Sequence, residues 1–505
     1  MLYRQGVPPY ATYLFKHALI QDAAYGTLLR EPRRALYARI AETLESQFAE
    51  ITENQPELLA GHWTRAGQIG KSARLWGKAG QRSAQRSALV EAIQQITLAL
   101  DQIATLPATP ALRREEIKLQ VALIAPLLPV KGYAAQETKA AVERARLLIE
   151  QAEALGEPPE DPLLLFSVLH GFWLQNYVAF NGEAARELAE QFLALAKKQA
   201  ATGPLITGHR LMGFSLLHMG EFVEGRAHLD RAIALYDPAE HRHLAALGHD
   251  ARVATLSLRS LALCVVGFRH AALADTDRAL KEAREIGQAA TLMYALLAAS
   301  MTYVVCGDYA EANAITDELI ALTDQIGSQF WGAWGMMQRG CVLALTGKAS
   351  DAVQTLTSSI TAFRSTGSTA DLSLYLSYLA EAHAHLRQFD SATRCIGEAM
   401  NVVETTKERW YEAEVHRVAG EIALLSLEPD TAKAEIYFER ALAVACKQQA
   451  KSWELRAAMS LARLWRDQGR QNEARQLLAP IYGWFTEGFD TLDLRGARAL
   501  LDELA

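Results

Sequence analysis

Apolar residues recur three and four positions apart through long stretches of this chain, and these stretches are rich in Ala, Leu, Glu, Gln and Arg. This spacing places apolar side chains on one face of an α-helix, and the residue types favour helix. Runs of alternating β-branched residues are almost absent. The pattern predicts an all-α fold, in which Tyr13–Leu29, with the sequence YLFKHALIQDAAYGTLL, is the first apolar helix.

Small residues mark a repeat within the helical pattern. Their separations are 40, 47, 40, 40, 40, 42 and 40 residues, at Ala185, Gly225, Ala272, Ala312, Ala352, Ala392, Ala434 and Ala474. Glycine stands five residues earlier in most repeats, at Gly220, Gly267, Gly307, Gly347 and Gly469, with Arg387 and Pro429 among the exceptions. A second glycine series has a strict spacing of 40, at Gly287, Gly327 and Gly367. A fixed period of this length indicates a repeated supersecondary unit.

The repeated unit is predicted to be a helical hairpin. Glycine adopts the left-handed conformation that ends many helices, so Gly307 is expected to end helix A and Gly327 helix B of one repeat. The small residue near the start of helix B allows the two helices to approach closely. Each hairpin has an apolar face that it buries only by stacking on its neighbours.

These features resemble the tetratricopeptide repeat. The small residue of helix A in that motif matches Gly213, Ser300, Gly340, Ala380 and Gly420, and the turn Gly-x-Tyr/Phe is also present. The usual repeat has 34 residues, whereas about 40 residues here allow two helices of about 17 residues each. The resemblance implies a right-handed α-solenoid of helical hairpins whose A helices line the concave face.

The regularity of the repeats divides the chain. The stretch ALGEPPEDP, at residues 154–162, contains three prolines and cannot continue a helix. We therefore expect degenerate helical repeats in residues 51–155 and a regular array in 160–480. Residues 481–505 break the pattern and end in an amphipathic helix, which suits a C-terminal capping segment.

Composition and charge exclude several classes of partner. The 505 residues have a formal net charge of −7, and the longest basic runs are pairs such as Arg33–Arg34 and Arg113–Arg114, so a nucleic-acid partner is not expected. The five cysteines form no CxxC pair, which is typical of thiols in a reducing compartment. Apolar runs such as Val121–Val130 fall short of the roughly 20 residues that span a bilayer. These observations predict a cytoplasmic protein without a membrane segment.

Several stretches in combination resemble a family of bacterial signalling proteins. They are FKHALIQDAAY, RRALYARIAETLE, PELLAGHWTRAG, LWGKAGQRSAQRSALVEAI and IYGWFTEGFDTLDL. Together they are similar to the C-terminal part of large proteins that join a class III adenylate/guanylate cyclase, an AAA-like signal-transduction ATPase and a helical repeat array. The resemblance covers essentially the whole chain, and it implies attached or partner ATPase and cyclase domains.

The catalytic motifs of that family are absent from this sequence. There is no G-x-x-x-x-G-K-[ST] loop to hold nucleotide phosphates, and the pattern predicts no sheet to carry the metal-binding aspartates of a cyclase. The resemblance places residues 1–50 at the end of a winged-helix segment that closes the ATPase module. The chain therefore resembles either a fragment or the product of a gene truncated by an internal start at Met1.

His17 is the nucleotide-sensor candidate that the resemblance supplies. In signal-transduction ATPases of this general kind, a Met-His-Asp type motif points its histidine at the β-phosphate of bound ADP, and Phe15-x-His17 resembles that motif. Ala18 stands where the motif has its aspartate. The alternative is a histidine that caps or packs against the next helix. Without a P-loop we expect no cofactor for the chain itself.

Aromatic residues near the starts of successive A helices are candidates for a ligand groove, because A helices line the concave face of such a superhelix. They are Trp331, Trp334, Tyr375, Tyr378, Trp410 and Tyr411. The alternative is that they pack between repeats.

Other chemistry-bearing residues form no recognisable site. His383 and His385 are two apart on a predicted helix and point to different faces, and the other histidines, including His241, lack the convergent partners that zinc needs. Asp275 and Asp277 diverge in the same way. We expect no metal site and no catalytic residue.

The sequence thus predicts a non-catalytic module that senses a protein, peptide or small-molecule signal and regulates an ATPase/cyclase signalling protein. Two alternatives remain: a stand-alone scaffold from a truncated gene, and part of an active cyclase whose catalytic domains lie outside this chain.

Overall fold

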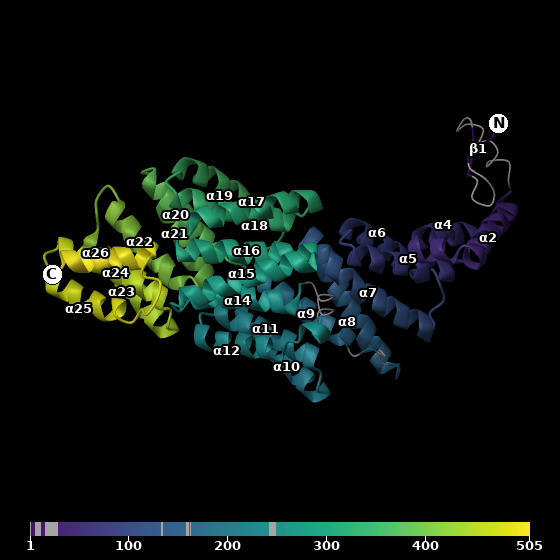
Figure 1. Cartoon of the computed structure of the whole chain (residues 1–505), viewed down its shortest axis with the longest axis horizontal. Coiled ribbons are helices and arrows are strands. Elements are labelled where there is room, and N and C mark those ends of the chain that lie inside the picture. Colours follow the sequence, from purple (N-terminus) through teal and green to yellow (C-terminus); the bar gives the residue numbers. More distant parts are fainter. Residues whose placement is uncertain are drawn as a thin grey trace. The chain divides into compact units, whose positions relative to one another are not determined.

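The structure is a computed structural model of the chain, and Figure 1 shows its helices in sequence colours. Two compact units are distinguished by their internal packing, unit 1 (Met1–Leu123) and unit 2 (Ile124–Ala505). The parts that the structure describes are residues 2–5, 12–15, 29–132, 135–157, 161, 163–241 and 249–505.

Unit 1 begins with a short antiparallel pair of strands, in which Leu2 lies opposite Phe15. The prediction of a helix from Tyr13 was wrong at residues 13–15, which lie in the second strand and include the aromatic residues that favour strands. Helices then follow without further strands in the described part of the unit. The elements are β1 (Leu2–Gln5), β2 (Thr12–Phe15), α2 (Arg30–Gln47), α3 (Ala49–Asn54), α4 (Pro56–Ala66), α5 (Ile69–Gln85) and α6 (Leu89–Ala104).

Unit 2 is helical throughout its described residues, and the boundary between the units falls inside α7. The helices are α7 (Pro110–Lys131), α8 (Gln136–Ala154), α9 (Leu163–Val178), α10 (Gly182–Gln199), α11 (Thr202–His218), α12 (Phe222–Leu235), α13 (Pro238–His241), α14 (Ala251–Val265), α15 (Arg269–Ile286), α16 (Ala289–Cys306), α17 (Tyr309–Ile326), α18 (Gln329–Leu345), α19 (Ala349–Ser365), α20 (Leu372–His385), α21 (Phe389–Thr406), α22 (Glu412–Leu425), α23 (Thr431–Gln448), α24 (Lys451–Asp467), α25 (Gln471–Tyr482) and α26 (Leu492–Glu503).

Eight successive helical hairpins build most of unit 2, and they confirm the predicted all-α repeat fold. Each pairs an A helix with the B helix that follows it: α9–α10, α11–α12, α14–α15, α16–α17, α18–α19, α20–α21, α22–α23 and α24–α25. Gly307 ends α16 with φ 82° and Gly327 ends α17 with φ 73°, as the two glycine series predict. Side chains other than glycine rarely adopt this conformation.

Small residues hold the two helices of each hairpin close together. The predicted set in the B helices is buried, with Ala312, Ala352 and Ala392 all at 0% exposure. Gly213 in α11 faces Gly225 in α12 so closely that a Cβ added at Gly213 would lie 2.6 Å from a methyl carbon of Leu229 and 2.9 Å from the carbonyl oxygen of Gly225. Because one of these atoms belongs to the backbone, the contact has little room to relax.

Replacing Gly213 with alanine is therefore expected to lower the free energy of unfolding by about 1–3 kcal/mol, the usual cost of overpacking. Gly397 in α21 is the matched control, because its added Cβ would meet no atom within 4 Å. Alanine at Gly397 is expected to raise the free energy of unfolding by about 0.5–1 kcal/mol, since alanine is the better helix former. Urea unfolding followed by circular dichroism measures both. Equal effects at the two sites would contradict the close approach.

The first three of these hairpins each also meet the hairpin five places further along the chain. The amides of Thr369 and Ala370, before α20, donate to the carbonyl oxygen of Val178 at the end of α9, at 2.7 and 3.1 Å. The amides of Arg409 and Trp410, before α22, donate in the same way to His218 at the end of α11, at 2.7 and 3.1 Å. Hydrogen bonds across the same number of hairpins also join α14 to α24 and the end of α7 to the start of α18. One turn of the repeat array is thus hydrogen-bonded to the next.

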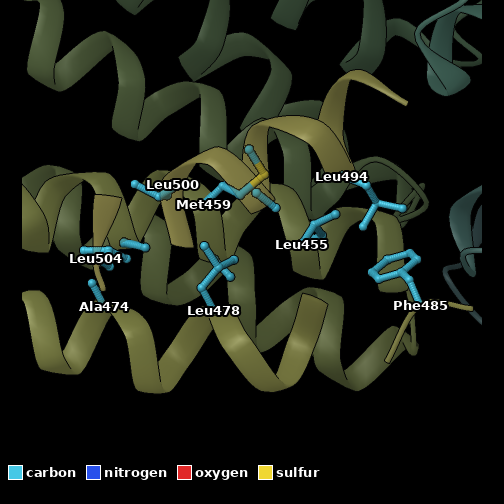
Figure 2. Packing of buried hydrophobic residues seen from close by; sticks show 11 residues of the cluster. Leu455, Met459, Ala474, Leu478, Phe485, Leu494, Leu500 and Leu504 are labelled. Carbon is cyan, nitrogen blue, oxygen red and sulfur yellow. The ribbon is translucent and has the colours of Figure 1, made fainter. Parts of the chain in front are cut away.

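The last helix packs across α24 and α25. Leu494, Leu500 and Leu504 are each at most 6% exposed, and they lie against Leu455 and Leu478. Figure 2 shows these side chains gathered in the space between the helices, with Met459 and Phe485 beside them. Helix α26 thereby covers the apolar face of the α24–α25 hairpin.

Helix α16 is longer and more apolar than the runs considered in the sequence. Among the described residues it is the one helix long and apolar enough to cross a membrane, with a mean hydropathy of 1.7 over Ala289–Cys306. The expectation that no apolar run approaches this length was wrong here. However, 78% of the segment is buried inside the protein, and a core helix of a soluble protein meets the same criterion.

Candidate functional site

The A helices of five successive hairpins converge on a cavity of about 230 Å³ in unit 2. These helices are α16, α18, α20, α22 and α24, and α26 completes the wall. Three acidic and three basic side chains line the cavity with apolar and tyrosine side chains: Glu381, Glu414, Asp493, Arg417, Arg456, Arg463, Val304, Tyr309, Leu345, Tyr378, Tyr411, Met459 and Leu492.

Glu414 lies between two arginines at the centre of this lining. The Nε of Arg417 donates to Oε1 of Glu414 at 2.8 Å, and Nη2 of Arg417 donates to Oε2 at 3.1 Å. Nη1 of Arg456 donates to the same Oε2 at 3.4 Å. The side chain of Glu414 is 1% exposed, so one buried carboxylate contacts two guanidinium groups that are themselves mostly buried. Such bidentate pairs fix the geometry of both partners.

Arg456 connects the cavity to the surrounding helices. Its Nε donates to Oδ2 of Asp493 in α26 at 2.7 Å, and its Nη2 donates to the carbonyl oxygen of Val305 in α16 at 2.8 Å. A change at the cavity that moves Arg456 therefore also alters its ion pair with Asp493, which holds α26 in place.

The two acidic groups nearest Arg417 differ in protonation behaviour. Burial by itself raises the pKa of Glu414, but the positive charges of Arg417 and Arg456 outweigh this effect, and the pKa is lowered. The pKa of Glu381 is raised, because its burial outweighs the attraction of Arg417, whose Nη2 is 3.4 Å away. Glu414 is thus ionised at neutral pH, while Glu381 takes up a proton more readily as the pH falls.

Arg463 lies at the edge of the cavity and differs from the other two arginines. Its side chain is exposed, and within the described residues no hydrogen bond or ion pair engages its guanidinium group. The cavity therefore presents one free cationic group, which suits a carboxylate or another planar anion.

Four of the six predicted groove aromatics are packed inside the repeat stack. Trp331, Trp334, Tyr375 and Trp410 are at most 3% exposed. Nε1 of Trp334 donates to the hydroxyl of Tyr375 at 2.8 Å, and Nε1 of Trp410 donates to Oδ1 of Asp371 at 2.8 Å. A groove lined by these four side chains does not match the structure, because neighbouring A helices and the adjacent turn of the array cover them.

The remaining two aromatics, Tyr378 and Tyr411, line the cavity. Their rings lie 6.3 Å apart, and burial raises the pKa of both hydroxyls well above the usual value, so both stay neutral. The charged residues beside them were not predicted from the sequence. The available signal was the presence of Glu381, Glu414 and Arg417 within otherwise apolar A helices.

The proposed nucleotide sensor His17 lies outside the described residues. Its role stays a prediction from the resemblance.

No family model matches the sequence. The chain is 24% identical to an uncharacterized protein of Rhizobium meliloti (strain 1021) over 425 residues, which are 82% of this chain and 40% of that protein. The chain therefore spans less than half the length of this relative.

Two solved structures resemble the chain in fold. A Rap protein complexed with Competence and Sporulation Factor superposes with a TM-score of 0.52 at 13% identity, over 76% of this chain and 99% of that one. The Cut9–Hcn1 hetero-tetramer of the APC/C superposes with a TM-score of 0.50 at 13% identity, over 96% of this chain and 94% of that one. The fold is tetratricopeptide-like. At this level of identity the likeness extends to the fold alone, and the link to cyclase–ATPase proteins stays a prediction.

Proposed function

We propose that this chain is a non-catalytic binding and sensing module that takes the end of a peptide into the cavity of unit 2. The observation that carries the proposal is the meeting of five A helices around a lining of three acidic and three basic side chains. The charges of that lining sum to zero, which favours a ligand that is itself polar with little net charge. A cavity of about 230 Å³ accommodates one or two residues rather than a large cofactor.

The free guanidinium of Arg463 specifies the part of the peptide that enters. Arg417 is already paired with Glu414, and Arg456 with Asp493. These two arginines therefore shape the cavity and its electrostatic potential, but they are not free to bind a ligand. Arg463 remains available for a bidentate contact with a carboxylate. We infer that the ligand is a short peptide whose C-terminal carboxylate binds Arg463. The fold similarity to a Rap protein solved with Competence and Sporulation Factor supports a binding role.

Regulation of attached domains is the second part of the proposal. The resemblance to cyclase–ATPase signalling proteins, and the greater length of the curated relative, support a place for this module within a larger protein. The ligand acts by population shift, because it binds more tightly to one arrangement of the array than to another. The Arg456–Asp493 pair supplies the structural link from the cavity to α26.

A peptide-selection experiment tests the binding role. The chain is incubated with a synthetic pool of randomised pentapeptides with free C-termini, and bound peptides are identified by mass spectrometry and measured by fluorescence anisotropy. We expect enrichment of specific sequences, and a loss of affinity of roughly 10–100-fold in Arg463→Gln, because a hydrogen bond to a charged group contributes about 1.5–3 kcal/mol.

Arg475→Gln is the matched control, since Arg475 is an exposed arginine of α25 that does not line the cavity. Its affinity is expected to equal that of the unmodified chain. The same pool with amidated C-termini should show no enrichment. Selected peptides that bind Arg463→Gln as tightly as the unmodified chain would place the binding site elsewhere, and a pool without any enrichment would contradict the peptide proposal.

A further inference from the structure

Three side chains that the cavity does not use meet where one turn of the array contacts the next. His218 ends α11, Asp371 precedes α20, and Glu408 lies in the turn before α22. They are 4%, 1% and 0% exposed. One nitrogen of the histidine and one oxygen of each carboxyl group lie within 4.8 Å of one another.

Contacts between the turns hold this cluster in place. The carbonyl oxygen of His218 accepts the amides of Arg409 and Trp410, which fixes the turn that carries Glu408 against the end of α11. Asp371 has a left-handed backbone with φ 58°, a conformation that costs free energy for a residue other than glycine and that Asp and Asn tolerate best. Two hairpins of one turn and one hairpin of the preceding turn therefore supply the three side chains.

The histidine is oriented as a ligand. Its Nδ1 lies 3.0 Å from the carbonyl oxygen of Phe214, which accepts a hydrogen bond and thereby places the proton on Nδ1. The lone pair of Nε2 then faces Asp371, with 3.7 Å between Nε2 and Oδ1. This distance is too long for a hydrogen bond. Histidine ligands of metals commonly donate their other ring N–H to a backbone carbonyl in this way.

The carboxyl groups have the complementary arrangement. Nε1 of Trp410 donates to Oδ1 of Asp371 at 2.8 Å, and the amide of Asp371 donates to both oxygens of Glu408, at 2.9 and 3.1 Å. Within the described parts of the chain, no lysine or arginine forms an ion pair with either group. Two neighbouring buried carboxyl groups are thus hydrogen-bonded by neutral donors, without a cation to balance them.

We propose that His218, Asp371 and Glu408 bind one divalent transition-metal ion of the zinc class. Zinc ligands lie about 2.0–2.2 Å from the ion, so two ligands of a tetrahedral site are roughly 3.4 Å apart, close to the observed separation of Nε2 and Oδ1. One imidazole and two carboxylates neutralise a charge of +2. The ion joins two turns of the array, and the hydrogen bonds from Trp410 and to Phe214 form its outer shell. No metal site was expected from the sequence, because its histidines lacked convergent partners there; the structure brings His218, Asp371 and Glu408 together from different hairpins.

Titration of zinc into the chelator-treated chain tests the proposal. Isothermal titration calorimetry is expected to show one tight equivalent, and zinc is expected to raise the melting temperature. Glu408→Gln and Asp371→Asn keep the shape of the side chains, and we expect each to weaken binding by about 100-fold while circular dichroism shows an unchanged helix content. Unchanged affinity in both variants, or no tight binding by the unmodified chain, would overturn the proposal.

A second measurement separates this cluster from other possible ligands without any variant of it. His209 and His228 lie with their Nδ1 atoms 3.0 Å apart, and Cys264 and Cys306 have adjacent sulfur atoms. X-ray absorption of the zinc-loaded unmodified chain is expected to show one imidazole and otherwise oxygen ligands. Sulfur ligation, or two imidazoles, would assign the metal to one of those pairs instead. His209→Asn, which removes the competing histidine pair, is expected to bind zinc with unchanged stoichiometry.

Discussion

Replacement of Trp334 by alanine is expected to lower the free energy of unfolding by about 3–5 kcal/mol, the usual cost of removing a buried tryptophan. Trp334 is 3% exposed, and its ring lies 5.3 Å from the rings of Phe330 and Phe363 and 5.7 Å from that of Trp331. The rings belong to α18 and to the B helix of the same hairpin, so truncation leaves a cavity at the centre of one repeat. Urea unfolding followed by circular dichroism measures the loss.

Tyr375→Phe isolates the polar part of the same contact. The hydroxyl of Tyr375 accepts hydrogen bonds from Nε1 of Trp334 and Nε2 of Gln338, both at 2.8 Å. Without that oxygen, two buried donors lose their acceptor, and we expect Tyr375→Phe by itself to lower the free energy of unfolding by about 1–3 kcal/mol. Phe489→Ala serves as the control, because Phe489 is 48% exposed and should contribute less than about 1 kcal/mol. A Trp334→Ala chain as stable as the unmodified one would mean that this side chain is not core.

The repeats could be predicted from sequence because they depend on local chemistry. Gly307 and Gly327 end helices where a left-handed residue is needed, and Ala312 is buried where two helices approach. Such features depend on neighbours within one hairpin, which the 40-residue period makes visible.

Glycine does not mark every helix end of the array. Arg387, Lys407 and Gln449 adopt φ values of 60°, 62° and 55° without being glycine. Lys407 ends α21 at the position 40 residues after Gly367, and Arg387 stands 40 residues after Gly347, so both keep the left-handed helix end of the repeat with another residue type. The local sequence gives no signal of the hydrogen bonds from Arg409 and Trp410 to His218, because they depend on how many hairpins complete a turn.

The candidate sites were missed for the same reason. Trp334 and Tyr375 were candidates for a groove, with packing between repeats as the alternative, and the structure buries both residues between neighbouring A helices. The ligands of the cavity and of the proposed metal site come from different hairpins. Their proximity is a property of the superhelix, and a single sequence shows only that charged residues occur in apolar helices.

Glu414→Ala is expected to have an effect as large as that of Trp334→Ala. Removing one partner of a buried ion pair costs about 3–5 kcal/mol, because the remaining charge is left buried without compensation. In this chain the loss of Glu414 affects both Arg417 and Arg456, whose side chains are 18% and 16% exposed. Arg417 keeps Glu381 at 3.4 Å and Arg456 keeps Asp493 at 2.7 Å, so we expect the lower end of this range. Glu439→Ala is the matched control, since Glu439 is an exposed glutamate of α23, and it should change the free energy of unfolding by less than about 0.5 kcal/mol.

The pH dependence identifies the ionised form of Glu414 as the source of this stability. The arginines hold its pKa below the usual value of 4.5, so the unfolded chain binds the proton more readily than the folded one. The stabilisation is therefore fully present well above pH 4.5 and is lost as the pH falls through the lower pKa of the folded state. The difference between the unmodified chain and Glu414→Ala should shrink in that acidic range, as measured by urea unfolding at a series of pH values. A difference that stays constant there would show that Glu414 contributes through packing and not through its charge.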